Sequence, residues 1–278
     1  MDQDKLIKCA FVYDFDGTLA EGDCAQWGVM PELKIGPKDF WKEVKERCKK
    51  DDGDEILAYL GMLAEKASGQ NSDVLSEASL LKHGGEIPLF PGVKSWFDRI
   101  NEYGKKHGLH IFHYIISSGL DAMIRGTPIG KEFRKIYACK YHYSEDGNTP
   151  KWAAQAVNYT TKTQFLFRIN KGIDNAWDNE AINKFIEISE REIPFERMIF
   201  FGDGDTDIPS MKMVRLQGGS SIAVFDKKKW TESNTQEKVE KLIAEERASY
   251  FVPADYEAGT QLDITVKGLI QLFKRRKI

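Results

Sequence analysis

Residues 9–18, CAFVYDFDGT, run from apolar side chains into two carboxylates, Asp14 and Asp16. Residues 198–207, MIFFGDGDTD, end in the same way, with Asp203 and Asp207. Short apolar runs bounded by Gly and Asp are typical of buried strands that lead into loops. Loops at the carboxyl ends of neighbouring parallel strands converge on one crevice, where ligands bind. If these two strands are neighbours, four or five carboxylates meet there, and because only a cation would make that repulsion tolerable, the sequence predicts a metal site.

The composition favours a globular protein with one main domain and a substantial insertion. Of the 278 residues, 41% are apolar and 30% are charged, with 40 Lys and Arg against 43 Asp and Glu. This balance of charge gives no reason to expect nucleic acid or an anionic membrane as a partner.

The cysteines and the chain ends favour a cytoplasmic protein. The four Cys form no CxxC pair and no His cluster accompanies them, which argues against zinc and against a disulfide framework. The first residues are acidic and lack the apolar stretch of a signal peptide. No apolar run approaches the roughly 18 residues that a bilayer-spanning helix needs.

Strands that alternate with helices predict an α/β fold with a Rossmann-like, mainly parallel sheet flanked by helices. Residues 20–88 show helical spacing of apolar residues and no convincing strand, so we interpret them as a helical insertion. The core domain is then 1–19 with 89–278. Predicted strands are 10–15, 110–116, 136–143, 198–201, 221–225 and 250–252, with a hairpin arm near Trp152. Predicted helices of the core are 160–169, 176–188, 237–247 and 262–274, and an amphipathic helix that begins at Val93.

Each motif has an ordinary structural explanation when it is taken alone. Asp14 and Asp16 project to one side of an extended strand, but Asp-Gly is also common turn chemistry. Ser117 and Ser118 follow a strand and precede a predicted helix, where hydroxyls and free amides suit phosphate but also cap helices. Lys162, taken alone, is a surface charge. The residues that follow Asp14 do not fit a helix–loop–helix calcium site.

The motifs in combination carry more information. The order is Asp-x-Asp-Gly-Thr, then Ser-x-Gly, then a Lys near a helix start, then Gly-Asp-Gly-x-Thr-Asp. This ordered set, which covers about 200 residues of the core, resembles the haloacid dehalogenase superfamily, whose members are mostly phosphohydrolases. The resemblance implies that Asp14 is the nucleophile and that Asp16 is the general acid and then the general base.

The same resemblance implies how phosphate and metal are held. Ser117, with Ser118 nearby, would bind the phosphoryl oxygens, and Lys162 would neutralise both nucleophile and phosphate. A Mg²⁺ ion would be held by the aspartates of the first and last motifs, which are Asp14, Asp16, Asp203 and Asp207. Magnesium suits this chemistry because a phosphate dianion repels a carboxylate nucleophile and an oxygen-seeking cation screens that repulsion.

The helical insertion and the last motif look most like the phosphoserine phosphatase branch of the superfamily. The resemblance implies that residues 20–88 form a helical cap domain that closes over the site and chooses the substrate. In that branch an acid about nine residues after the nucleophile grips the amino group of the substrate, which points to Asp23. Arg47 is a candidate clamp for a substrate carboxylate.

Three functions are compatible with the sequence. The first is a magnesium-dependent phosphatase that hydrolyses a small phosphorylated metabolite through an aspartyl-phosphate. The second is a phosphomutase that uses the same intermediate. The third is a non-catalytic binding protein on the same fold.

Overall fold

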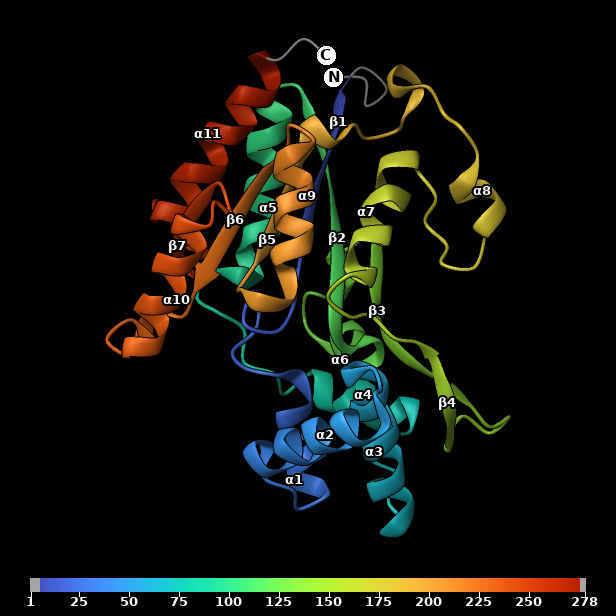
Figure 1. The fold of residues 1–278 in the computed structure, drawn as a ribbon. Helices are drawn as coiled ribbons and strands as arrows, with labels where there is room; N and C mark the ends of the chain where they lie inside the picture. The colour runs from blue at the N-terminus through green and yellow to red at the C-terminus, as the bar shows by residue number, and fades with distance from the viewer. Residues whose placement is uncertain (1–5, 276–278) are drawn as a thin grey trace.

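The computed structural model describes residues 6–275, so the first five residues and the end of the basic C-terminal run, from Arg276, lie outside it. The described chain forms a seven-stranded sheet in the order β4-β3-β2-β1-β5-β6-β7 (Figure 1). Neighbouring strands are parallel except for the antiparallel pair β3 and β4. The strands are β1 (Ile7–Tyr13), β2 (Leu109–Leu120), β3 (Lys135–Tyr143), β4 (Pro150–Gln155), β5 (Met198–Gly202), β6 (Ser220–Phe225) and β7 (Tyr250–Pro253). The predicted α/β fold class is confirmed.

Helices cover both faces of this sheet. Helices α5 (Val93–Lys106) and α11 (Gln261–Arg275) pack together on one face, while α7 (Thr161–Lys171) and α9 (Ile208–Leu216) pack on the other (Figure 1). Helix α6 (Asp121–Gly126) follows β2, and α10 (Ser233–Ala244) connects β6 to β7. In residues 6–275, no helix combines the length and the apolar composition that crossing a membrane requires.

The strand β1 lies at the centre of the sheet, between β2 and β5. Phe11, Val12 and Tyr13 are fully buried, because helices cover both faces of the strand. Tyr13 is opposite Phe201 of β5 in the parallel register. The loops that follow β1 and β5 therefore leave the sheet side by side, as the two apolar-to-acidic stretches predict.

A buried chain of hydrogen bonds fixes Tyr13 directly before the first motif. The indole N–H of Trp96 donates to the Tyr13 hydroxyl at 3.0 Å, and that hydroxyl lies 3.2 Å from Nδ1 of His113. Nε2 of His113 lies 3.0 Å from Oδ1 of Asn101. Every donor finds an acceptor if His113 is neutral with its proton on Nε2. Burial lowers the pKa of His113 to about 3.

This buried histidine predicts a pH-dependent stability. The pKa of His113 is about 3 in the folded chain against an ordinary 6.5, so below pH 6.5 only the unfolded chain takes up the proton. The free energy of unfolding should then fall by up to about 1.4 kcal/mol per pH unit until about pH 3, and the contribution is complete above pH 6.5. Urea unfolding of the wild type and of His113→Gln between pH 7 and 4 measures the two slopes. Equal slopes would contradict the assignment.

Residues 20–88 form a helical layer at the carboxyl ends of the strands (Figure 1). A short 3-10 helix η2 (Cys24–Gln26) is followed by α1 (Val29–Glu32), α2 (Pro37–Asp51), α3 (Glu55–Gly69) and α4 (Glu77–Gly84). The layer touches the core closely where α4 meets α6. A Cβ at Gly84 would lie 2.1 Å from the carbonyl oxygen of Met123, and one at Gly126 would lie 2.0 Å from that of Leu81. A side chain at either position would collide with the backbone of the other helix, so only glycine allows α4 and α6 to pack this closely.

Two segments differ from the sequence prediction. The helix expected over 176–188 is only α8 (Asn179–Asn183), and Trp177 and Phe185 on its two sides are 77% and 76% exposed. A short helix is stabilised mainly by burying an apolar face against the rest of the protein. The apolar residues of 176–188 are exposed, so most of this segment does not form a helix. Helix α9 was not predicted, although Pro209 in its first turn is a recognised start signal. The hairpin arm near Trp152 is present as β4.

Candidate active site

The site begins where β1 and β5 end. The backbone N–H of Asp14 donates to the carbonyl of Phe201 at 2.8 Å, which extends the β1–β5 pairing to the first motif. Asp203 follows the last residue of β5, and Asp207 lies one 3-10 turn later. Carboxylate oxygens of Asp14, Asp203 and Asp207 lie within 4.8 Å of one another. The structure thus brings together segments that are almost two hundred residues apart.

Two glycines let these carboxylates approach. Gly17 has a φ of +69°, and a Cβ there would lie 2.6 Å from Oδ2 of Asp203. A Cβ at Gly202 would lie 2.4 Å from Oδ2 of Asp207. A residue with a side chain at Gly17 would displace Asp203, and one at Gly202 would displace Asp207. Glycine at both positions therefore allows the carboxylates to converge.

Lys162 is the buried cation that contacts two acids of the cluster. It lies in the first turn of α7 and is fully buried, with Nζ 3.0 Å from Oδ2 of Asp14 and 2.7 Å from Oδ1 of Asp207. Burial alone would lower the pKa of Lys162, but the charges of Asp14 and Asp207 outweigh it, so the pKa is raised and the ammonium stays protonated. The structure therefore places Lys162 at the site rather than on the surface.

Asp207 uses both of its oxygens within the protein. Oδ1 pairs with Lys162, and Oδ2 accepts the backbone N–H of Asp203 at 3.2 Å. Asp207 is fully buried. Its carboxylate thus fixes the lysine and the loop that carries Asp203 in one arrangement.

The donor set fits a hard divalent cation. Three carboxylates converge beside two ammonium groups, because Lys162 contacts Asp14 and Asp207 and Nζ of Lys238 lies 3.7 Å from Oδ2 of Asp203. The cluster still has more negative than positive charge, and carboxylate oxygens are the ligands that Mg²⁺ prefers. Asp14 and Asp203, with Asp207 alongside, are the residues that would hold it. The prediction also included Asp16, but the structure does not place the Asp16 carboxylate in this group.

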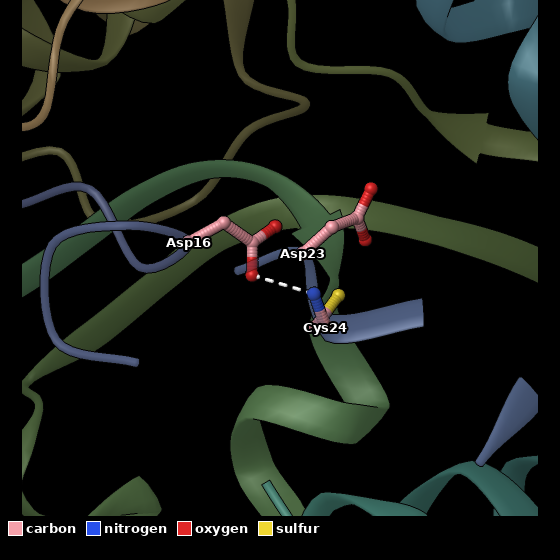
Figure 2. A group of neighbouring side chains, drawn as sticks. All are labelled: Asp16, Asp23 and Cys24. Carbon is pink, nitrogen blue, oxygen red and sulfur yellow. Dashed lines mark hydrogen bonds between the residues drawn. The ribbon is translucent and has the colours of Figure 1, made fainter. Parts of the chain in front are cut away.

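Asp16 lies instead with Asp23 and Cys24, and ligand atoms of the three lie within 4.8 Å of one another (Figure 2). Oδ1 of Asp16 accepts the backbone N–H of Cys24 at 2.8 Å. Burial, and then the charges of Asp23 and Asp14, raise the pKa of Asp16 well above that of an ordinary aspartic acid. These surroundings favour the protonated carboxyl group, which is the form that a general acid needs.

Ser117 and Ser118 lie within the last residues of β2, the other neighbour of β1, because this strand continues past the predicted end at 116 to Leu120, with an irregular register between Ile116 and Leu120. Ser117 is buried and its Oγ accepts the N–H of Gly119 at 3.0 Å. The buried Oγ of Ser118 has no hydrogen-bond partner in the described chain. A Cβ at Gly119 would lie 3.0 Å from Oδ2 of Asp16, so glycine allows this end of β2 to pack against the first motif.

A cavity of about 480 Å³ opens above this cluster. Its floor includes Asp14, Asp16, Ser117, Ser118 and Asp203. The helical layer contributes one wall, with Asp23, Trp41, Glu55, Ile56 and Tyr59, and Tyr159 before α7 adjoins it. A further part of the lining comes from the end of β6 and from α10, and includes Asn234, Thr235 and Lys238.

Arg47 does not reach this cavity. It lies on the outer surface of α2 and pairs with Glu65 of α3 at 3.1 Å, with its side chain 43% exposed. Asp23 does line the cavity, as the sequence suggests. The sequence did not predict that α10 contributes to the cavity. No local sequence pattern indicates this contribution, because the α10 residues reach the site only through the path of the chain after β6.

No model of a known protein family matches the chain. An uncharacterised protein of Borreliella burgdorferi is 29% identical over 276 residues, which covers 91% of this chain and 93% of that protein.

Solved structures give the fold. A substrate-bound phosphoserine phosphatase has a TM-score of 0.56 and 15% identity, over 94% of this chain and 98% of that one. A HAD family hydrolase of Salmonella enterica serovar Typhi has a TM-score of 0.59 and 14% identity, over 96% of this chain and 72% of that one. A probable phosphoserine phosphatase of Vibrio cholerae has a TM-score of 0.58 and 15% identity, over 98% and 67%. The chain therefore has the fold of the haloacid dehalogenase hydrolases, in the form found in phosphoserine phosphatases.

Proposed function

We propose that the protein is a magnesium-dependent phosphatase that hydrolyses a small phosphomonoester through an aspartyl-phosphate on Asp14. The observation that carries the proposal is the buried Lys162, which touches both Asp14 and Asp207 on the floor of a cavity. A buried ammonium that is coupled to two carboxylates and lies at a cavity is the kind of arrangement found at functional sites. The fold shared with phosphoserine phosphatases supports the same conclusion.

Asp14 and Asp16 have different roles in the proposed reaction. Oδ of Asp14 attacks phosphorus, and the bond from phosphorus to the leaving oxygen breaks. Asp16 gives its proton to that oxygen, and the alcohol departs. Asp16, now a carboxylate, takes a proton from water as the water oxygen attacks phosphorus and the bond to Asp14 breaks. Inorganic phosphate leaves and the starting state is restored.

The cationic and hydroxyl groups hold the phosphoryl oxygens. Lys162 offsets the charge of Asp14, and Ser118 offers a hydroxyl that has no partner in the described chain. A bound Mg²⁺ supplies further positive charge against the phosphate dianion. The helical layer limits the access of bulk water to the intermediate.

The path of oxygen from water tests this proposal. Hydrolysis of a small phosphomonoester in H₂¹⁸O with Mg²⁺ should place one ¹⁸O in each free phosphate, and EDTA should stop the release. Mass spectrometry of the phosphate reads the label. Transfer of unlabelled phosphoryl groups to an acceptor would favour a phosphomutase. No release from a broad ester panel would indicate a non-catalytic protein.

A further inference from the structure

The acids of the cluster are paired with two lysines in different surroundings. Lys162 is fully buried and contacts Asp14 and Asp207, whose side chains are 6% and 0% exposed. Lys238 lies on α10, and its Nζ is 3.7 Å from Oδ2 of Asp203. The side chains of this second pair are 35% and 36% exposed. One cation of the cluster is therefore shut away from water, and the other is open to it.

The end of the Lys238 side chain lies beside the backbone of the last motif. A Cβ at Gly204 would lie 2.1 Å from both Cε and Nζ of Lys238, so the absence of a side chain at Gly204 leaves room for the ammonium. Lys238 and Asp203 also both line the cavity. The ammonium therefore meets the acid of the last motif from the side of the cavity, on a helix that carries none of the four motifs.

The pair of Lys238 and Asp203 is weak. Its separation of 3.7 Å is longer than a hydrogen bond between charged groups, whereas Nζ of Lys162 lies 2.7 Å from Oδ1 of Asp207. Ion pairs that are open to water contribute little to stability, because water and salt screen them. Lysine also carries its charge on a flexible four-carbon stem. The Lys238 ammonium can therefore leave Asp203 at small cost, while Lys162 cannot leave its two acids.

We propose that Lys238 is an exchangeable counter-ion of Asp203, and that it gives up this carboxylate when a divalent cation binds there. The inference rests on the metal site of the proposed function and adds a residue, outside the motifs, that sets how tightly the site holds Mg²⁺. The two cations need the same carboxylate, and they repel each other at short range. Lys238 therefore weakens the binding of Mg²⁺ to the cluster.

Calorimetric titration of the whole protein with MgCl₂ alone tests the inference without any turnover. Lys238→Gln removes the ammonium and keeps most of the length of the side chain. We expect this variant to bind Mg²⁺ about fivefold more tightly than the wild type at low ionic strength, since an exposed ion pair no longer has to be broken and a repulsion is lost. Loss of a residue that only supported the loop would leave the affinity unchanged or lower it.

Two control variants separate the position of the lysine from its charge. Lys238→Arg keeps a cation at the same place and should keep the wild-type affinity for Mg²⁺. Lys241→Gln removes the same charge from an exposed position in the last turn of α10. It should also bind Mg²⁺ as the wild type does, because a screened charge at the surface does not compete for Asp203.

The outcomes distinguish this inference from the proposed function. Tighter binding in Lys238→Gln, with wild-type affinity in both controls, supports the exchange. If Lys238→Gln binds Mg²⁺ no more tightly than the wild type, or if Lys241→Gln tightens binding equally, the exchange is overturned and the metal site stands. If neither the wild type nor Lys238→Gln binds Mg²⁺, the metal site of the proposed function fails and the inference fails with it.

Discussion

Asp14→Asn is expected to lower kcat for phosphomonoester hydrolysis by at least about 10⁴-fold, because the covalent route through Asp14 is lost. An amide is nearly the same size and still accepts the Phe15 N–H, which lies 2.7 Å from Oδ1 of Asp14. It cannot form the bond to phosphorus. Phosphate release from para-nitrophenyl phosphate under saturating substrate and Mg²⁺ measures the loss.

The matched control for this variant is Asp39→Asn, which changes an exposed carboxylate in the first turn of α2. Both proteins should show the wild-type circular dichroism spectrum, because neither substitution changes the volume of a buried side chain. Turnover close to that of the wild type in Asp14→Asn would exclude Asp14 as the nucleophile.

The sheet and the floor of the site could be predicted from the sequence because their signals are local. An apolar run that is buried on both faces and ends in Gly and Asp indicates a strand of a parallel sheet and its loop. Asp14 and Asp203 follow two such runs, and parallel pairing of β1 with β5 brings their loops together. Ser117 required the family resemblance, because a serine after a strand also caps helices.

The remaining parts of the site depend on packing, which a single sequence does not encode locally. Asp16 is two residues from Asp14, so extended geometry would place both carboxyls together, but the loop turns after Phe15 and the Asp16 carboxyl meets Cys24 instead. The side on which Arg47 projects depends on how α2 packs on α3. The contribution of α10 depends on the path of the chain after β6.

Lys162→Met is expected to affect both stability and activity. The substitution removes a fully buried ammonium and leaves Asp14 and Asp207 without their cation. Breaking one side of a buried ion pair costs about 3–5 kcal/mol, so the free energy of unfolding without Mg²⁺ should fall by that amount. The kcat for hydrolysis should fall by at least about 10³-fold, because the positive charge beside nucleophile and phosphate is lost. Urea unfolding and phosphate release measure the two effects.

A second substitution separates these effects. In Lys162→Met with Asp207→Asn, the buried carboxylate that lost its partner becomes a neutral amide that still accepts the Asp203 N–H, which Oδ2 of Asp207 accepts at 3.2 Å. Much of the lost stability should return, while kcat should stay at the level of the single variant, since no cation replaces Lys162 beside Asp14. A double-mutant cycle gives the coupling energy between the two side chains. If kcat recovered together with stability, Lys162 would be a structural residue, and the chemistry assigned to the cluster would have to proceed without its charge.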